Sequence, residues 1–255
     1  MAASVRKRGM YATVERDGEL DQVAVEEPLE LMVDGVPFTV TMRTPGQDEE
    51  LAAGLLYTEG LITRAPELGP PEDLAANAVD VTGPLEAQPA ARPFYSSSAC
   101  GVCGKGALEQ LALDCPELEP GPVVERGVLA GLPERMRQPT FQRTGGLHAA
   151  AVFSLGGELE LLREDVGRHN ALDKVVGRCL LDARLPLAGS VMCVSGRLSF
   201  ELVSKTVRAG ARVLVGVGAP SSLAVELARD RNLTLAGFAR AGRVNVYSAP
   251  ERVAG

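Results

Sequence analysis

Alternating apolar and polar residues predict two β-hairpins in this chain. In each, two short alternating runs flank a pair of turn residues, which is the usual sequence pattern of a hairpin. The paired runs are residues 29–33 with 37–42, around Asp34-Gly35, and residues 148–155 with 158–163, around Gly156-Gly157.

Other segments carry apolar residues at helical spacing, and these alternate with short apolar runs typical of buried strands. The predicted helices are 48–60, 104–113, 128–143, 170–181, 200–209 and 221–231. The predicted strands outside the hairpins are 78–82, 190–194, 212–217, 233–238 and 244–247. Strands that alternate with helices indicate an α/β layer built on a largely parallel or mixed sheet. We therefore expect an α/β protein, α+β overall, with a smaller β-rich part at its N-terminus.

The chain divides into three predicted stretches. Residues 1–10 show no pattern and are expected to be a disordered tail. Residues 11–127 hold the first hairpin, one helix and a loop with two cysteines. Residues 128–255 form the main α/β domain, because the alternation of strands and helices is concentrated there.

Composition narrows the classes of function. The chain has 255 residues, 45% hydrophobic, and a net charge of −7, so bulk charge gives no support for nucleic-acid binding. No apolar run approaches the length of a membrane span, and no leader segment is recognisable, so we expect a cytoplasmic protein. Five cysteines, an odd number, do not form a disulfide framework.

The strongest chemical feature is the Cys-Gly-Val-Cys segment, Cys100 to Cys103, which lies between glycines before a predicted helix. The N-terminus of a helix and the nearby Lys105 both favour a thiolate, so these thiols are expected to be reactive. Three chemistries suit such a pair: half of a zinc site, dithiol redox exchange, and persulfide transfer. Zinc needs more ligands than this pair supplies, and thioredoxin chemistry needs a preceding strand that the Ser-rich segment does not provide. No metal is therefore expected.

Several loops next to predicted strands carry groups suited to anions. Arginine guanidinium groups bind phosphates in bidentate fashion, and loops at the carboxyl edge of a sheet are common ligand sites. The candidates are His148, which follows two glycines, Arg168 and His169 before a helix, Arg197 and Ser221 in strand-to-helix loops, and the terminal loop Phe238, Ala239, Arg240, Ala241, Gly242 and Arg243. For each alone, a solvated loop is an equally good interpretation.

Taken together, these segments resemble the FdhD family of formate dehydrogenase accessory sulfurtransferases. The resemblance covers roughly residues 20–250. Its motifs occur in family order, and the Asp165-Val-Gly-Arg-His-Asn170 run is the most specific. The others are the two-cysteine segment, Thr144 to Ala149, Ser195 to Arg197, Gly218 to Ser222, and Phe238 to Arg243.

The resemblance implies a cytidine-deaminase-like fold and a homodimer. It also implies that Cys100 takes sulfur as a persulfide from a cysteine desulfurase, with Cys103 as second thiol. The sulfur would pass to the molybdenum cofactor, Mo-bis(molybdopterin guanine dinucleotide), for formate dehydrogenase. The cofactor segment matches Phe238 to Arg243, where GDP or GMP would act as a mimic.

Three rival functions remain to be separated from this one. A zinc-dependent deaminase would need H-x-E followed by P-C-x-x-C, but His148 is followed by Ala149-Ala150 and the cysteines come before it. A molybdenum-cofactor chaperone would bind without transferring sulfur. A thioredoxin-type reductase would reduce a disulfide substrate such as insulin.

Overall fold

A six-stranded mixed sheet forms the centre of the molecule. The computed structural model describes residues 6–71, 77–83, 85 and 115–255. The sheet has the order β10-β9-β11-β12-β13-β14. Its strands are β9 (His148–Ser154), β10 (Leu159–Asp165), β11 (Ser190–Val194), β12 (Val213–Gly216), β13 (Thr234–Arg240) and β14 (Arg243–Ser248). The three adjacent strands β11, β12 and β13 are parallel. On one side β9 pairs antiparallel with β11 and forms a hairpin with β10, and on the other side β14 pairs antiparallel with β13.

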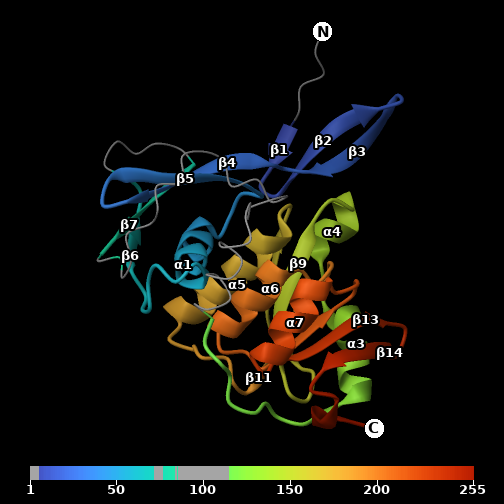
Figure 1. The fold of residues 1–255 in the computed structure, drawn as a ribbon. Helices are drawn as coiled ribbons and strands as arrows, with labels where there is room; N and C mark the ends of the chain where they lie inside the picture. Colours follow the sequence, from blue (N-terminus) through green and yellow to red (C-terminus); the bar gives the residue numbers. More distant parts are fainter. Residues whose placement is uncertain (1–5, 72–76, 84, 86–114) are drawn as a thin grey trace.

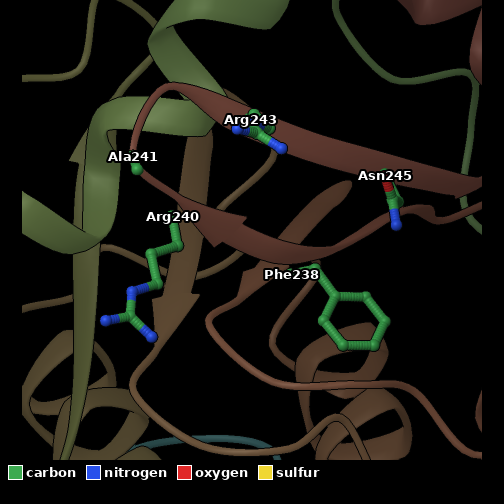
Figure 2. Close-up of a pocket in the computed structure, with 5 residues that line it drawn as sticks. All are labelled: Phe238, Arg240, Ala241, Arg243 and Asn245. Carbon is green, nitrogen blue, oxygen red and sulfur yellow. The ribbon is translucent and has the colours of Figure 1, made fainter.

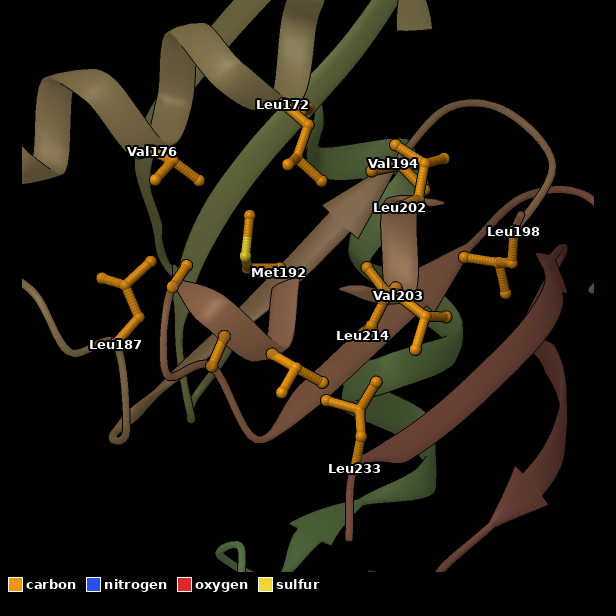
Figure 3. Packing of buried hydrophobic residues seen from close by; sticks show 14 of the residues in the cluster. Leu172, Val176, Leu187, Met192, Val194, Leu198, Leu202, Val203, Leu214 and Leu233 are labelled. Atoms are coloured by element: carbon orange, nitrogen blue, oxygen red, sulfur yellow. The ribbon is translucent and has the colours of Figure 1, made fainter. Parts of the chain in front are cut away.

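Helices cover both faces of this sheet because successive strand residues point to opposite sides. On one face, Met192 and Val194 pack with α5 (Arg168–Leu181), α6 (Phe200–Arg208) and α7 (Ser222–Asp230), as Figure 3 shows for much of that cluster. On the other face, Val191 and Cys193 pack with α3 (Arg126–Arg135). The result is a three-layer α/β/α arrangement.

A smaller β-rich part precedes this unit, as expected. Its four-stranded sheet has the order β5-β4-β7-β6. The strands are β4 (Glu27–Val33), β5 (Val36–Arg43), β6 (Glu67–Gly69) and β7 (Ala78–Thr82). Helix α1 (Asp48–Thr58) packs between this sheet and α5 (Figure 1), with Leu31, Leu51 and Leu180 in one shared cluster.

Helices α1 and α5 approach until their backbones touch. A Cβ on Gly54 would lie 1.9 Å from the carbonyl oxygen of Asp173, and one on Gly177 would lie 1.8 Å from that of Glu50. Only glycine fits at either position. This contact joins the N-terminal sheet firmly to the central sheet.

The remaining elements are short. Strands β1 (Arg6–Arg8), β2 (Tyr11–Arg16) and β3 (Glu19–Ala24) form a separate sheet beside α4 (Pro139–Thr144), where Arg143 lies 5.3 Å from the centre of the Tyr11 ring. Strand β8 (Val124–Glu125) pairs with β15 (Val253–Ala254), which follows the 3-10 turn Pro250–Arg252.

Most expected elements are present, and the fold class is confirmed, but two expectations are wrong. Residues 128–143 form two helices instead of one, because Pro139 lacks the N–H that a continuous helix needs and instead starts α4. Part of the expected disordered tail, Arg6–Arg8, is a strand paired with β2. The helix expected at 104–113 lies outside the described residues. No helix among the described residues is long and apolar enough to span a membrane.

Candidate functional site

The candidate motifs meet at one edge of the central sheet. Parallel strands β11, β12 and β13 end at this edge, and β9 begins there because it runs antiparallel to β11. His148, the first residue of β9, pairs with Asp165, the last residue of β10. The Ser195 N–H donates to the Ala149 carbonyl at 2.9 Å, which fixes the loop after β11 beside His148. Loops far apart in sequence therefore form one continuous surface.

Three glycines, Gly196, Gly218 and Gly237, form what we call the glycine floor of this edge. The Gly218 N–H donates to the Gly196 carbonyl at 3.0 Å, and the Phe238 N–H donates to the Gly218 carbonyl at 3.1 Å. A Cβ on Gly218 or Gly237 would lie 3.0 Å from the carbonyl oxygen of the preceding floor glycine. These three positions carry no side chain, so backbone connects His148 at one end to Phe238 at the other.

Two helices begin beside the floor, and each is capped by a serine. The Ser199 hydroxyl accepts from the Leu202 N–H at 3.4 Å, and the Ser221 hydroxyl accepts from the Ala224 N–H at 3.3 Å. Ser221 is thus the N-cap of α7. The hydroxyl of Ser221 keeps its own proton, which it can donate to a ligand.

One end of the edge carries a cationic cluster, which we define as His148, Arg168 and His169. Burial, and then the nearby charges of Arg168 and His169, lower the pKa of His148 against the opposing effect of Asp165. The Nε atom of Arg168 is buried and has no hydrogen-bond partner within the described part of the chain. An imidazole with a lowered pKa therefore lies beside a guanidinium whose Nε has no hydrogen-bond partner among the described residues.

His169 is held by a carboxylate on the neighbouring helix. Oε2 of Glu201 lies 2.9 Å from Nε2 of His169, and this contact lowers the pKa of Glu201. Within the described part of the chain Nε2 of His169 makes no well-aligned hydrogen bond, so the contact is one of short distance alone. The Glu201 carboxylate therefore lies against the His169 imidazole on the side that faces α6.

The other end carries the arginine hairpin, which we define as residues 238–243. Ala241 (φ 51°) and Gly242 (φ 72°) both have positive φ, as a two-residue type I′ turn requires. Phe238 also has positive φ (53°), at an irregularity in the pairing of β13 with β14. Residues held in such conformations cluster at functional sites.

The arginine hairpin borders a shallow hollow of about 450 Å³, lined by Phe238, Arg240, Ala241, Arg243 and Asn245. In Figure 2 the side chains of Phe238 and Arg240 project from the same side of the strand. Phe238 is 49% exposed, high for a large apolar side chain. Neither arginine shows an ion-pair partner in the part of the chain that is described. The hollow thus combines an aromatic face with two available guanidinium groups.

The structure separates one expected residue from the hollow. The side chain of Ala239 is fully buried and packs with α3, so at most its backbone is available to a ligand. Alternation along the strand causes this, since Ala239 points opposite to its neighbours. Arg197 is exposed at the loop after β11 and points to no partner within the described ranges.

Sequence reasoning missed Glu201, Asn245 and Glu134. Glu201 follows the capping Ser199 by two residues, a position where acids favour the helix dipole. Asn245 lies two residues after Arg243 on β14, which is the spacing of side chains on one face of a strand. Glu134 accepts from the Ala241 N–H at 2.9 Å and supports the turn, which no local pattern signals.

The two predicted reactive cysteines, Cys100 and Cys103, lie outside the described residues. The other three, Cys115, Cys179 and Cys193, are buried and free. Burial raises the pKa of Cys179 to about 11 and that of Cys193 further still. Cys115 Sγ lies 3.0 Å from the Ser204 hydroxyl. Among the described ranges, no group of three or more metal-ligating side chains is found.

Comparison with known proteins gives a consistent result. Residues 24–254 match the model of the FdhD/NarQ family. The chain is 48% identical to the sulfur carrier protein FdhD of Streptomyces coelicolor, over 94% of this chain and 93% of that protein. It is 44% identical to the sulfur carrier protein FdhD of Sulfurisphaera tokodaii, over 92% of each.

A solved structure gives the same assignment at the level of the fold. The crystal structure of a Desulfotalea psychrophila protein, assigned as a formate dehydrogenase accessory protein, superposes with a TM-score of 0.72. It is 25% identical and covers 98% of this chain and 99% of its own. The shared motifs, the shared fold and the identity to curated relatives over nearly the whole chain show that this protein belongs to the FdhD/NarQ family.

Proposed function

We propose that this protein is a sulfur carrier of the sulfurtransferase type. It takes a persulfide from a cysteine desulfurase and passes the sulfur to Mo-bis(molybdopterin guanine dinucleotide), which then serves formate dehydrogenase. The family and the names of its relatives support a sulfur carrier. The observation that carries the cofactor part is the arginine hairpin, where an exposed aromatic ring and two unpaired guanidinium groups border one hollow.

The arginine hairpin suits the nucleotide ends of this substrate. The ring of Phe238 offers a face on which a guanine base can stack, a contact worth about 1–3 kcal/mol in nucleic-acid sites. Arg240 and Arg243 can bind phosphate oxygens through charge-assisted hydrogen bonds. The glycine floor leads from this hollow to the cationic cluster, so a long polyanion has favourable contacts at both ends.

The described thiols are unsuited to sulfur transfer, which leaves the Cys100–Cys103 pair. Cys115, Cys179 and Cys193 are buried. Burial also raises the pKa of Cys179 and Cys193, and a thiol held protonated in this way is a poor nucleophile.

The sulfur-loading step is a thiol exchange without net oxidation. The Cys100 thiolate attacks the outer sulfur of the donor persulfide, a new S–S bond forms, and the donor cysteine leaves as a thiolate. In the second step Cys103, as second thiol, attacks the inner sulfur as a thiolate. A Cys100–Cys103 disulfide forms, and the outer sulfur leaves as hydrosulfide for the bound substrate, so the two thiols supply the two electrons.

The first test replaces Cys100. We expect Cys100→Ala to lose at least about 99% of sulfur transfer while GDP binding persists, because the carrier thiolate is absent and the hairpin is untouched. The measurement is mass spectrometry for a sulfur adduct of about 32 Da after incubation with a desulfurase and cysteine, with Cys179→Ala as control. A Cys100→Ala protein that still activates formate dehydrogenase fully would contradict the assignment. Parent protein that binds cofactor but never gains the adduct would instead indicate a chaperone.

The second test concerns the arginine hairpin. Arg240→Ala/Arg243→Ala should weaken GDP binding by at least about tenfold, since two charged phosphate contacts are lost. Calorimetric titration with GDP measures this. Arg16→Ala/Arg64→Ala removes the same charge from two exposed sites in the N-terminal part and should leave the affinity unchanged. Equal affinities in both double variants would place the nucleotide site away from the hairpin.

A further inference from the structure

Asp165 is a completely buried carboxylate whose acceptor positions are all occupied. Its Oδ1 accepts from the Gly167 N–H at 2.8 Å and from Asn170 Nδ2 at 3.1 Å. Its Oδ2 accepts from the Thr44 N–H at 3.1 Å and lies 2.8 Å from Nζ of Lys174, whose side chain is also fully buried. No lone pair remains to bind a ligand, so Asp165 does not act as a contact residue.

The groups that Asp165 holds belong to the loop that begins α5. Gly167 and Asn170 flank Arg168 and His169, two basic residues in the first turn of that helix. A positive side chain is unfavourable at a helix N-terminus, where the dipole is itself positive. The backbone of this turn is therefore held in place against the repulsion between the Arg168 guanidinium and the helix dipole.

Thr44 completes the arrangement from the other part of the molecule. Its hydroxyl accepts from the Val166 N–H at 3.1 Å, and its carbonyl accepts from Lys174 Nζ at 2.8 Å. Thr44 lies between β5 and α1, so the N-terminal part fastens the loop at the sheet edge. We refer to Thr44, Asp165 and Lys174 as the buried clamp.

We propose that Asp165 is a positioning residue, which through the buried clamp sets the placement of Arg168 and His169 beside His148. Only the expected effect on sulfur transfer rests on the proposed function. The placement itself can be measured on the protein without any ligand.

The chain provides a matched control. Asp173 and Lys205 form a second buried pair, 2.8 Å apart, that packs against Thr58 instead of the sheet edge. The test variants are Asp165→Asn/Lys174→Met and Asp173→Asn/Lys205→Met, which remove both charges of each pair. Replacement of a whole buried pair by neutral side chains is tolerated far better than loss of one partner.

The measurement is the NMR titration of the imidazole groups, which is simple because the chain has two histidines. The charged groups acting on His148 are Arg168 and His169 on α5 and Asp165 on β10. If the structure stayed fixed, loss of the Asp165 charge would lower the pKa of His148 further. If Arg168 and His169 move away, that pKa rises towards its ordinary value. The two explanations therefore differ in sign.

We expect the pKa of His148 to rise by at least about half a unit in Asp165→Asn/Lys174→Met and to stay unchanged in the control. Sulfur transfer should fall at least about tenfold in the first variant alone. A fall in the pKa, no change, or an equal rise in both variants would overturn the proposal.

A second variant keeps the test decisive if the first does not fold. Thr44→Val removes the hydroxyl that holds Val166 but leaves every charge in place. A rise in the pKa of His148 then reports displacement alone, and an unchanged value would overturn the proposal. If the unmodified protein shows no sulfur transfer, the proposed function is contradicted. The NMR titrations of His148 in the variants would still test the buried clamp.

Discussion

At the scale of single residues, burial separates the cysteines into two groups. Cys179 packs inside the layer formed by α5, and Cys193 lies in the middle of the central sheet. Desolvation disfavours a thiolate at both positions and raises the pKa of each thiol. The protein can therefore hold a reactive thiol elsewhere without losing sulfur to these two by exchange.

This separation is testable by alkylation. With a pKa of about 11, the Cys179 thiol is ionised to about one part in three thousand at pH 7.5. Iodoacetamide should leave Cys179 and Cys193 unmodified in the folded protein and label both in urea, as read by peptide mass spectrometry. Labelling of either in the folded state at the rate of a free cysteine would contradict their burial.

The residue types of the site could be inferred from sequence, but not all of their orientations. His148, Arg168, Arg240 and Arg243 all lie along the same edge of the sheet, at strand ends or in the turns that follow them. Ala239 points into the core, because strand alternation decides the direction of each side chain in the hairpin. The contact of His169 with Glu201 joins residues far apart in sequence, so no local pattern reveals it.

At the scale of elements, the crossing of α1 and α5 is the tightest helix contact that we describe. Gly177→Ala would place a methyl group 1.8 Å from the carbonyl oxygen of Glu50, and the two backbones must separate to admit it. We expect a loss of about 3 kcal/mol in the free energy of unfolding, measured by urea denaturation.

Gly131→Ala is the control for this substitution. Gly131 lies in α3, where an added Cβ would meet only the Nε of Arg135 at 3.9 Å. The alanine should stabilise the protein by about 0.5–1 kcal/mol, because it reduces the freedom of the unfolded chain. Similar losses for both variants would mean that helix propensity, and not the crossing, sets the effect.

Element boundaries followed the sequence where the turn chemistry was distinct. The hairpin of β4 and β5 was predicted from Asp34-Gly35, and the positive φ of both residues confirms the turn. The hairpin of β2 and β3 was missed, although Asp17-Gly18 has the same pattern, because charged residues on both sides hide the alternation. Packing of that hairpin against α4 compensates for its few apolar residues.

At the scale of the whole molecule, two sheets are joined through a pair of helices. The alternation of strands and helices predicted the parallel centre of the larger sheet, and the antiparallel pairs β9–β10 and β13–β14 form its margins. The parallel pairing of β4 with β7 could not be predicted, because it links segments separated by a helix and a long connection. The meeting of the N-terminal part with the sheet edge at Thr44 is likewise a product of tertiary packing.

The glycine floor has a consequence for how ligand preference can change during evolution. A Cβ at Gly218 or Gly237 would press on a backbone carbonyl oxygen at 3.0 Å, so a side chain can be added at either position only if the backbone shifts. What these two positions present to a ligand is peptide groups, whose character does not depend on the sequence. Changes in ligand preference are therefore expected to come first from the residues at the two ends of the floor.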